Sequence, residues 1–263
     1  MIETGYIKTN ALNIGTIKQC LNIDLFLGVE LLKSKKLHYN FKDRLFTNLP
    51  NLTSINLDNF IEIPISRNAY DSYYYISIMI NEKKTKFLVD LGFSGEIQLK
   101  KDISKTNNLI EITDVFYFGA NSKQVKTIEK YNDVELSFPN NVRLINSISK
   151  IKGNKLNLIG IGFFKQFEEV IFDFKQKKIY VSKSKLIQNN IDRPIGFEIN
   201  DNKIFISYIN HSSEYFKSGF RVGNIVNFED KTIQQTLLQA APCEINELIR
   251  TWKNENKKPL VIK

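Results

Sequence analysis

The chain has 263 residues, enough for one large domain or two modest ones at about 150 residues per domain. Hydrophobic residues make up 42% of the sequence and aromatic residues 12%, which excludes disorder throughout. No segment approaches the ~20 apolar residues of a membrane-spanning helix, so no membrane span is expected. Two cysteines and two histidines are too few for a disulfide scaffold or for a zinc site built on these residues.

The net charge of +9 does not by itself indicate a nucleic-acid partner. Of the 37 basic residues six are Arg, and Arg is better suited than Lys to bidentate recognition of phosphates and bases. The lysines occur in short clusters along the whole chain rather than in one stretch. We therefore expect no nucleic-acid binding.

Most of the chain is predicted to form strands. Runs rich in β-branched and aromatic residues alternate with short polar turns, a pattern typical of β-hairpins. Three hairpins are expected: Tyr73–Ile80 with Thr85–Val89, Val134–Phe138 with Val142–Ile145, and Val170–Phe174 with Lys178–Val181. Short helices are predicted at Gly28–Lys35, Phe163–Phe167 and Glu244–Lys253.

Two polar stretches divide the chain into three segments. The first, Thr47–Leu57, contains Pro50, and the second, Lys183–Arg193, is followed by Pro194. The expected segments are residues 1–50, 51–187 and 190–263, the last of which has the size of a small autonomous domain.

Two of these segments contain similar stretches. Leu27–Phe46 and Ile159–Tyr180 share a glycine flanked by hydrophobic residues, then a short amphipathic run, then an Asn/Asp-Phe-Lys turn. The glycines are 132 residues apart and the turns 133. The shared order predicts an internal duplication. The alternative is a chance likeness between two Lys-rich β segments.

The most distinctive motif is Phe87–Gly95, which reads FLVDLGFSG. An apolar strand ends in Asp90, and a tight turn follows that contains Gly92 and Ser94. This resembles the active-site loop of aspartic peptidases, in which Asp90 would be the catalytic residue and Leu91, Gly92 and Ser94 would complete the loop. The turn glycine would let the backbone approach the carboxylate closely.

The resemblance is to retropepsin-like, duplicated bacterial aspartic peptidases and covers residues 20–182. Leu158-Ile159-Gly160 matches the hydrophobic-hydrophobic-Gly motif that closes a lobe of that family. The resemblance implies a mostly β protein with a retropepsin-like β-barrel lobe over 51–187. It also implies a flap hairpin over Val115–Val125, with Tyr117 and Gly119 as candidates. No metal and no organic cofactor is expected.

The chemistry of such a site needs two carboxylates. Held about 3 Å apart they cannot both ionise, so they share one proton. One acts as general base on the water that attacks the scissile carbonyl, and the other acts as general acid.

The sequence departs from the family pattern in two ways. Leu91 stands where the family has Thr or Ser, so the hydroxyl that braces the partner loop is missing. The sequence also contains one aspartate loop where the family has two, since neither Asp24 nor Asp43 follows an apolar strand and precedes a glycine turn. Residues 1–50 resemble the closing part of a first lobe, whose aspartate loop would lie upstream of Met1.

Three interpretations of Asp90 therefore stay open. It is a catalytic aspartate in an intact enzyme or a homodimer, a relic in an inactive lobe, or a structural residue whose carboxylate accepts backbone N–H groups.

The C-terminal segment resembles a PDZ domain. Pro194–Ile199 is similar to its carboxylate-binding loop and first groove strand, and Ser213–Val226 follows its pattern around Gly219 and Gly223. The resemblance implies that a peptide adds as a strand to the exposed edge. The expected groove residues are Ile195, Gly196, Phe197, Ile199, Ile245, Leu248 and Ile249. The alternative is a domain that packs on the peptidase lobe with its groove closed.

Together the two resemblances predict an aspartic-peptidase-like protein followed by a PDZ domain that binds protein substrates or the C-termini of partners. The alternative is an inactive peptide-binding module with a degenerate peptidase fold. Localisation stays open: no signal peptide is visible at the N-terminus, whereas PDZ-bearing relatives are commonly exported.

Overall fold

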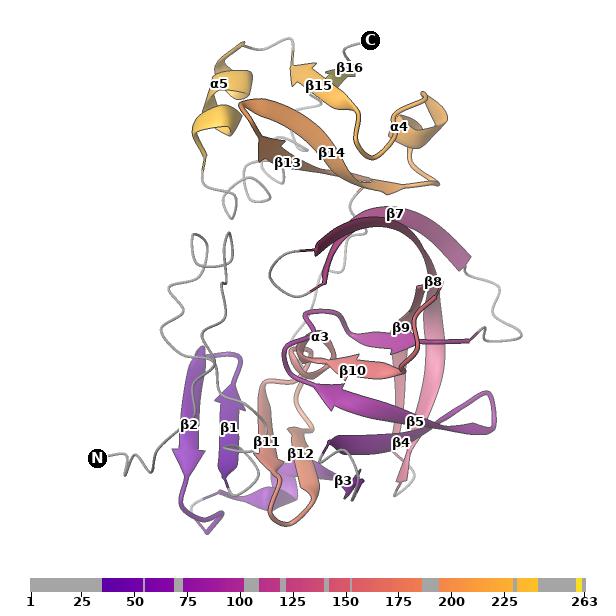
Figure 1. Ribbon diagram of the computed structural model, residues 1–263. Helices are drawn as coiled ribbons and strands as arrows, with labels where there is room; N and C mark the ends of the chain where they lie inside the picture. Colours follow the sequence, from indigo (N-terminus) through magenta and orange to yellow (C-terminus); the bar gives the residue numbers. More distant parts are fainter. Residues whose placement is uncertain are drawn as a thin grey trace. The chain divides into compact units, whose positions relative to one another are not determined.

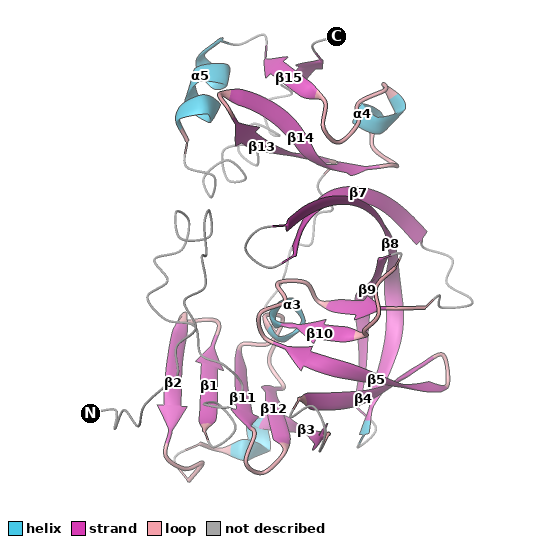
Figure 2. Ribbon diagram, in the orientation of Figure 1, coloured by secondary structure: helices cyan, strands magenta, loops and turns pink. Residues whose placement is uncertain are grey.

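The computed structural model describes residues 35–53, 55–68, 73–101, 109–118, 122–139, 142–151, 153–185, 194–228, 231–240 and 259–261. Strands dominate these residues, which confirms the predicted mostly β class (Figure 2). The chain divides into two compact units. One takes its described residues from Phe26–Ile112 and Thr127–Asp192, and the other from Thr113–Lys126 and Arg193–Lys263. The expected boundaries of the three segments stay a prediction.

The larger unit is built on one continuous, strongly curved path of strands (Figure 1). In chain order these strands are β1 (Lys36–Asn40), β2 (Leu45–Leu49), β3 (Phe60–Arg67), β4 (Tyr74–Ile80), β5 (Lys83–Asp90), β6 (Ile97–Leu99), β7 (Leu109–Phe118), β8 (Ser122–Phe138), β9 (Val142–Ile151), β10 (Leu158–Gly160), β11 (Glu169–Asp173) and β12 (Lys178–Ser182). Their spatial order is β7-β8-β9-β6-β10-β5-β4-β3-β12-β11-β1-β2. The part of β7 after Ile112 and the part of β8 before Thr127 belong to the smaller unit. A 3-10 helix η1 (Leu57–Asn59) precedes β3, and a single-turn helix α3 (Ile161–Phe164) follows β10.

All three predicted hairpins are present. The turn between β4 and β5 has two residues, Asn81 and Glu82, both with positive φ (47° and 65°). This is the backbone twist that closes a tight hairpin. Strand β5 runs as far as Asp90, so the candidate catalytic residue is the last residue of its strand.

Alternation along the strands builds the core of this unit. In β4 the inward positions Tyr74, Ile76, Ile78 and Ile80 are buried, as the period of two requires. An aromatic cluster contributed by α3, by β11 and by the residues on either side of β11 packs against them. Its members are Phe163, Phe164, Phe167, Phe172 and Phe174, with the centroids of neighbouring rings 4.9–5.8 Å apart.

The smaller unit has its own sheet and core. Its elements are β13 (Ile195–Asn200), β14 (Lys203–Asn210), α4 (Glu214–Lys217), β15 (Ile225–Phe228), α5 (Lys231–Gln239) and β16 (Pro259–Val261). Strand β14 pairs with β13 and with β15, and β15 pairs with β16. The core residues are Ile195, Phe197, Ile204, Ile206, Ile209, Val226 and Phe228.

The helices depart from the sequence predictions. Helix α3 begins at Ile161, two residues earlier than expected, because Gly160 ends β10 in extended conformation (φ −105°, ψ 178°). Helix α5 was not predicted, because polar residues outnumber apolar residues in its sequence, KTIQQTLLQ. The helix expected at Glu244–Lys253 lies outside the described residues. So does the one expected at Gly28–Lys35, apart from Lys35, which is not helical.

Candidate functional site

The candidate site lies where β5 ends. Asp90 is half-buried there, and its carbonyl oxygen accepts a hydrogen bond from the Phe93 N–H (3.1 Å), which closes a turn. The chain then passes through the exposed Gly92 and Ser94 before it enters the buried strand β6. The loop thus presents a carboxylate at the end of a rigid strand.

The carboxylate of Asp90 is held by its own loop. Its Oδ1 accepts a hydrogen bond from the Gly92 N–H (2.9 Å), an Asx turn. A Cβ at Gly92 would lie 3.3 Å from the same oxygen, so glycine suits this close approach. No other described residue hydrogen-bonds to the carboxylate. The Asx turn is what the structural interpretation of Asp90 predicts, and it leaves Oδ2 available to a further group.

Strand β10 positions the loop from one side. It lies between β5 and β6, parallel to β5 with Gly160 opposite Asp90, and antiparallel to β6. Backbone hydrogen bonds tie the start of α3 to the loop: the Ile161 N–H donates to the Phe93 carbonyl (2.9 Å) and the Gly162 N–H to the Gly95 carbonyl (3.1 Å).

Gly160 allows this packing. A Cβ at Gly160 would lie 2.3 Å from the carbonyl oxygens of Phe93 and Gly95, a distance that no side chain tolerates. The hydrophobic-hydrophobic-Gly motif therefore has a local physical role, which is to let β10 pass directly beneath the Asp90 loop.

Two positioning residues were missed by the sequence reasoning. Asn157 donates from Nδ2 to the Lys86 carbonyl (3.1 Å) and accepts at Oδ1 from the Lys100 N–H (2.9 Å), so it fixes β10 to both neighbours. A Cβ at Gly162 would lie 2.6 Å from the Ser94 carbonyl oxygen. The available signal in the sequence was that Asn157 and Gly162 lie close to the motif Leu158-Ile159-Gly160.

Leu91 occupies the place of the family's hydroxyl residue. It is half-buried and packs against the hydrophobic core, as do Val89 and Ile161 beside it. A leucine side chain offers no hydrogen-bond donor or acceptor to a partner loop. The position thus serves packing in this chain.

Of the two flap candidates, Tyr117 lies in the described part of the chain. Tyr117 lies in β7 and belongs to the smaller compact unit, whereas Asp90 belongs to the larger one. Gly119 lies outside the described residues. The flap therefore stays a prediction.

Four of the seven expected groove residues fall in β13. Ile195 and Phe197 are buried in the core of the smaller unit, and Ile199 is half-buried against it. A Cβ at Gly196 would lie 3.0 Å from the Tyr208 Cβ, so close strand packing favours the glycine. Ile245, Leu248 and Ile249 lie outside the described residues. In the described part of the chain β13 pairs with β14 alone, and its other edge carries no strand.

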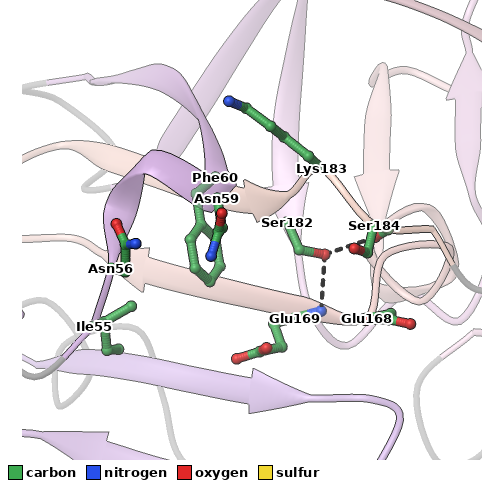
Figure 3. A pocket seen from close by; sticks show the side chains of 9 residues that line it. All are labelled: Ile55, Asn56, Asn59, Phe60, Glu168, Glu169, Ser182, Lys183 and Ser184. Atoms are coloured by element: carbon green, nitrogen blue, oxygen red, sulfur yellow. Dashed lines mark hydrogen bonds between the residues drawn. The ribbon is translucent and has the colours of Figure 1, made fainter.

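A separate cavity of about 520 Å³ lies in the larger unit (Figure 3). It opens between η1, the start of β11 and the end of β12. Its lining residues are Ile55, Asn56, Asn59, Phe60, Glu168, Glu169, Ser182, Lys183 and Ser184, none of them from the Asp90 loop. The Ser182 hydroxyl accepts from the Glu169 N–H (3.1 Å) and donates to the Ser184 carbonyl (2.7 Å), so it holds the wall together.

The described residues do not form a metal site or a membrane-spanning helix. Among the described residues no three metal-ligating side chains cluster, and no helix is long and apolar enough to cross a membrane. His38 bonds through Nε2 to Glu169 Oε2 (2.7 Å), and His211 through Nε2 to the Thr113 hydroxyl (2.8 Å).

No protein-family model and no curated protein matches this chain. Among solved structures, a retropepsin-like aspartic protease from Rickettsia conorii matches with 23% identity over 46% of this chain and 90% of its own length. The TM-score is 0.33, and at that value the likeness carries no argument about the site. Any function assigned to the Asp90 loop therefore rests on the chain's own geometry.

Proposed function

We propose that this protein is an aspartic-peptidase-like hydrolase in which Asp90 is one half of a catalytic dyad. The observation that supports it is the Asp90 loop itself. A carboxylate at the end of a buried strand, turned by Gly92, is seated on a second strand whose Gly160 permits direct backbone contact.

The proposed reaction is hydrolysis of a peptide bond. A water molecule between two carboxylates loses a proton to the ionised one and attacks the scissile carbonyl. The protonated carboxyl then supplies a proton to the leaving amine, and the C–N bond breaks. Asp90 supplies one carboxylate, and the second must come from another Asp loop, either in a second copy or in a partner lobe.

The C-terminal segment is proposed to bind protein or peptide partners by strand addition. Among the described residues no second strand pairs with β13, which supports this, since an extended peptide can continue a sheet at such an edge. The positive φ of Gly219 (94°) and Gly223 (88°) accounts for the two-glycine spacing that resembles a PDZ domain.

A second candidate function is a peptide-binding module without catalysis. The specific observation in its favour is Leu91, which packs into the core and cannot brace a partner loop. In this form the lobe serves as a scaffold and Asp90 serves as a turn residue.

A cleavage assay separates the two functions. Unfolded protein substrates are incubated with the full chain and with D90N, and the products are read by mass spectrometry. We expect D90N to lower the cleavage rate by about 100-fold or more, because it removes an acid–base group. The matched control is D43N, an exposed aspartate in a hairpin turn, which leaves the rate unchanged. Equal rates in wild type and D90N would contradict catalysis by Asp90. Binding of the same peptides without cleavage would favour the scaffold.

A further inference from the structure

Two hairpins of the larger unit correspond residue by residue. Strand β1 (Lys36–Asn40) corresponds to β11 (Glu169–Asp173), and β2 (Leu45–Leu49) to β12 (Lys178–Ser182). Each strand has five residues, and the offset is 133 throughout. The offset of the Asn/Asp-Phe-Lys turns therefore extends over both complete hairpins.

The turns of the two hairpins share their geometry. Arg44 and Lys177 occupy the same position and have φ values of 57° and 56°. Asn40 accepts a hydrogen bond at Oδ1 from the Asp43 N–H (2.8 Å), and Asp173 accepts at Oδ1 from the Gln176 N–H (2.9 Å).

The pairing between the hairpins is symmetric. Strands β1 and β11 are antiparallel, with Lys36 opposite Asp173, Asn40 opposite Glu169, and His38 opposite Ile171 at the centre. Since His38 and Ile171 are themselves equivalent positions, a local twofold axis passes between them. This axis exchanges the two hairpins, which lie side by side in Figure 1.

The symmetry ends at the outer edges. The outer edge of β12 pairs with β3 over five residues, from Lys178 opposite Pro64 to Ser182 opposite Phe60. The strand order ends at β2, and among the described residues no strand pairs with its outer edge.

Equivalent side chains of β12 and β2 also differ in how far they are buried. Ile179 of β12 has no exposed surface, whereas Phe46 at the equivalent position of β2 is 49% exposed. Alternation places both side chains on the same face of the sheet. Phe46 contacts the Tyr39 ring at 4.6 Å, so the apolar face continues as far as β2 and there lacks a cover among the described residues.

We propose that the outer edge of β2 binds an extended segment of another polypeptide as an antiparallel strand. Its chemistry is that of β3, with aliphatic side chains at alternate positions, as in Ile61, Ile63 and Ile65. The edge supplies backbone donors and acceptors, and Phe46 supplies an apolar contact. The strand itself, Leu45–Leu49, carries no charge that would repel a partner.

The β3 of a second copy of this chain is a poorer occupant. It is already paired, over Phe60–Pro64 with β12 and over Ile65–Arg67 with β4. The edge of β11 is likewise filled by β1. The inference rests on the hairpins alone and holds whether or not Asp90 is catalytic.

The test uses the full chain and a synthetic peptide with the sequence of Asn59–Asn68, read by hydrogen exchange at the amides of Leu45–Leu49. We expect the peptide to slow exchange there by about tenfold or more, whereas a shuffled peptide or one N-methylated at alternate residues does not. F46K weakens peptide binding by about tenfold. The matched control I145K changes another exposed strand residue, 67% exposed, and leaves binding unchanged.

Absence of protection with the native peptide would overturn the proposal. So would equal binding by F46K, with its fold checked by circular dichroism. Protection that rises with protein concentration and without peptide would assign the edge to a second copy instead, and would also overturn it.

Discussion

Gly160 is the residue on which the Asp90 loop depends most directly. The loop's carbonyl oxygens of Phe93 and Gly95 both lie where a Cβ at residue 160 would sit. Both belong to backbone that is hydrogen-bonded to β10 and to the start of α3, so neither can move away cheaply.

We therefore expect G160A to destabilise the protein. Overpacking of this kind costs about 1–3 kcal/mol, because backbone must shift to admit the methyl group. Urea unfolding of G160A and wild type measures the difference. The control is S94A, which changes an exposed side chain of the same loop and should leave the midpoint within error. An unchanged midpoint for G160A would contradict the prediction, because it would show that the loop backbone can shift at no cost in stability.

The motif around Asp90 predicted local structure correctly but did not predict the long-range contacts of the loop. The apolar run before it and the glycine after it predicted a strand end and a tight turn, and both are present. The sequence could not reveal the clamp made by Asn157, because its partners lie 71 and 57 residues away. Contacts of that kind come from topology rather than from local pattern.

At the scale of elements, the hairpins were the most predictable feature. Alternating apolar residues around short polar turns locate β4/β5, β8/β9 and β11/β12, because alternation and turn chemistry are both local. Helix α5 was missed because its residues Lys231–Gln239 are mostly polar, and its packing against the core of the smaller unit through Leu238 is not visible in the local sequence.

Equivalent residues of the two matched hairpins should differ in their effect on stability. I179A removes a side chain with no exposed surface and should cost about 2–5 kcal/mol through the lost contacts and the cavity left behind. F46A truncates a half-exposed ring and should cost clearly less, about 1 kcal/mol. Thermal unfolding of both variants measures this. Equal losses would mean that β2 is covered in solution and that its edge already has a partner.

At the scale of the whole molecule, three buried or half-buried tyrosines link stability to alkaline pH. Burial raises the pKa of Tyr39 and Tyr180 in the larger unit and of Tyr215 in the smaller one. Above about pH 10 the unfolded chain releases these protons while the folded protein retains them, so the free energy of unfolding falls as pH rises.

We therefore expect stability to decline as pH rises past about 10, and Y39F to make the decline shallower. Urea unfolding at a series of alkaline pH values measures both effects. A decline that is identical in wild type and Y39F would exclude a contribution from Tyr39.

The mostly β class was predictable from composition and periodicity, but the division into units was not. Thr113–Lys126 joins residues of the C-terminal segment in one compact unit, although nothing in its sequence separates it from the strands around it. Long-range strand pairing decides such membership, and a single sequence does not encode it locally.

The membership of Asp90 in an aspartate dyad is tested most directly by calorimetry, which measures the binding of a statine-containing peptide. Such a peptide mimics the tetrahedral transition state, so a dyad binds it far more tightly than the matching substrate. If Asp90 is half of a dyad, the wild-type protein binds the statine peptide tightly and D90N loses about 100-fold or more in affinity. Equal affinity for the statine peptide and for its substrate analogue, unchanged by D90N, would contradict the membership of Asp90 in a dyad.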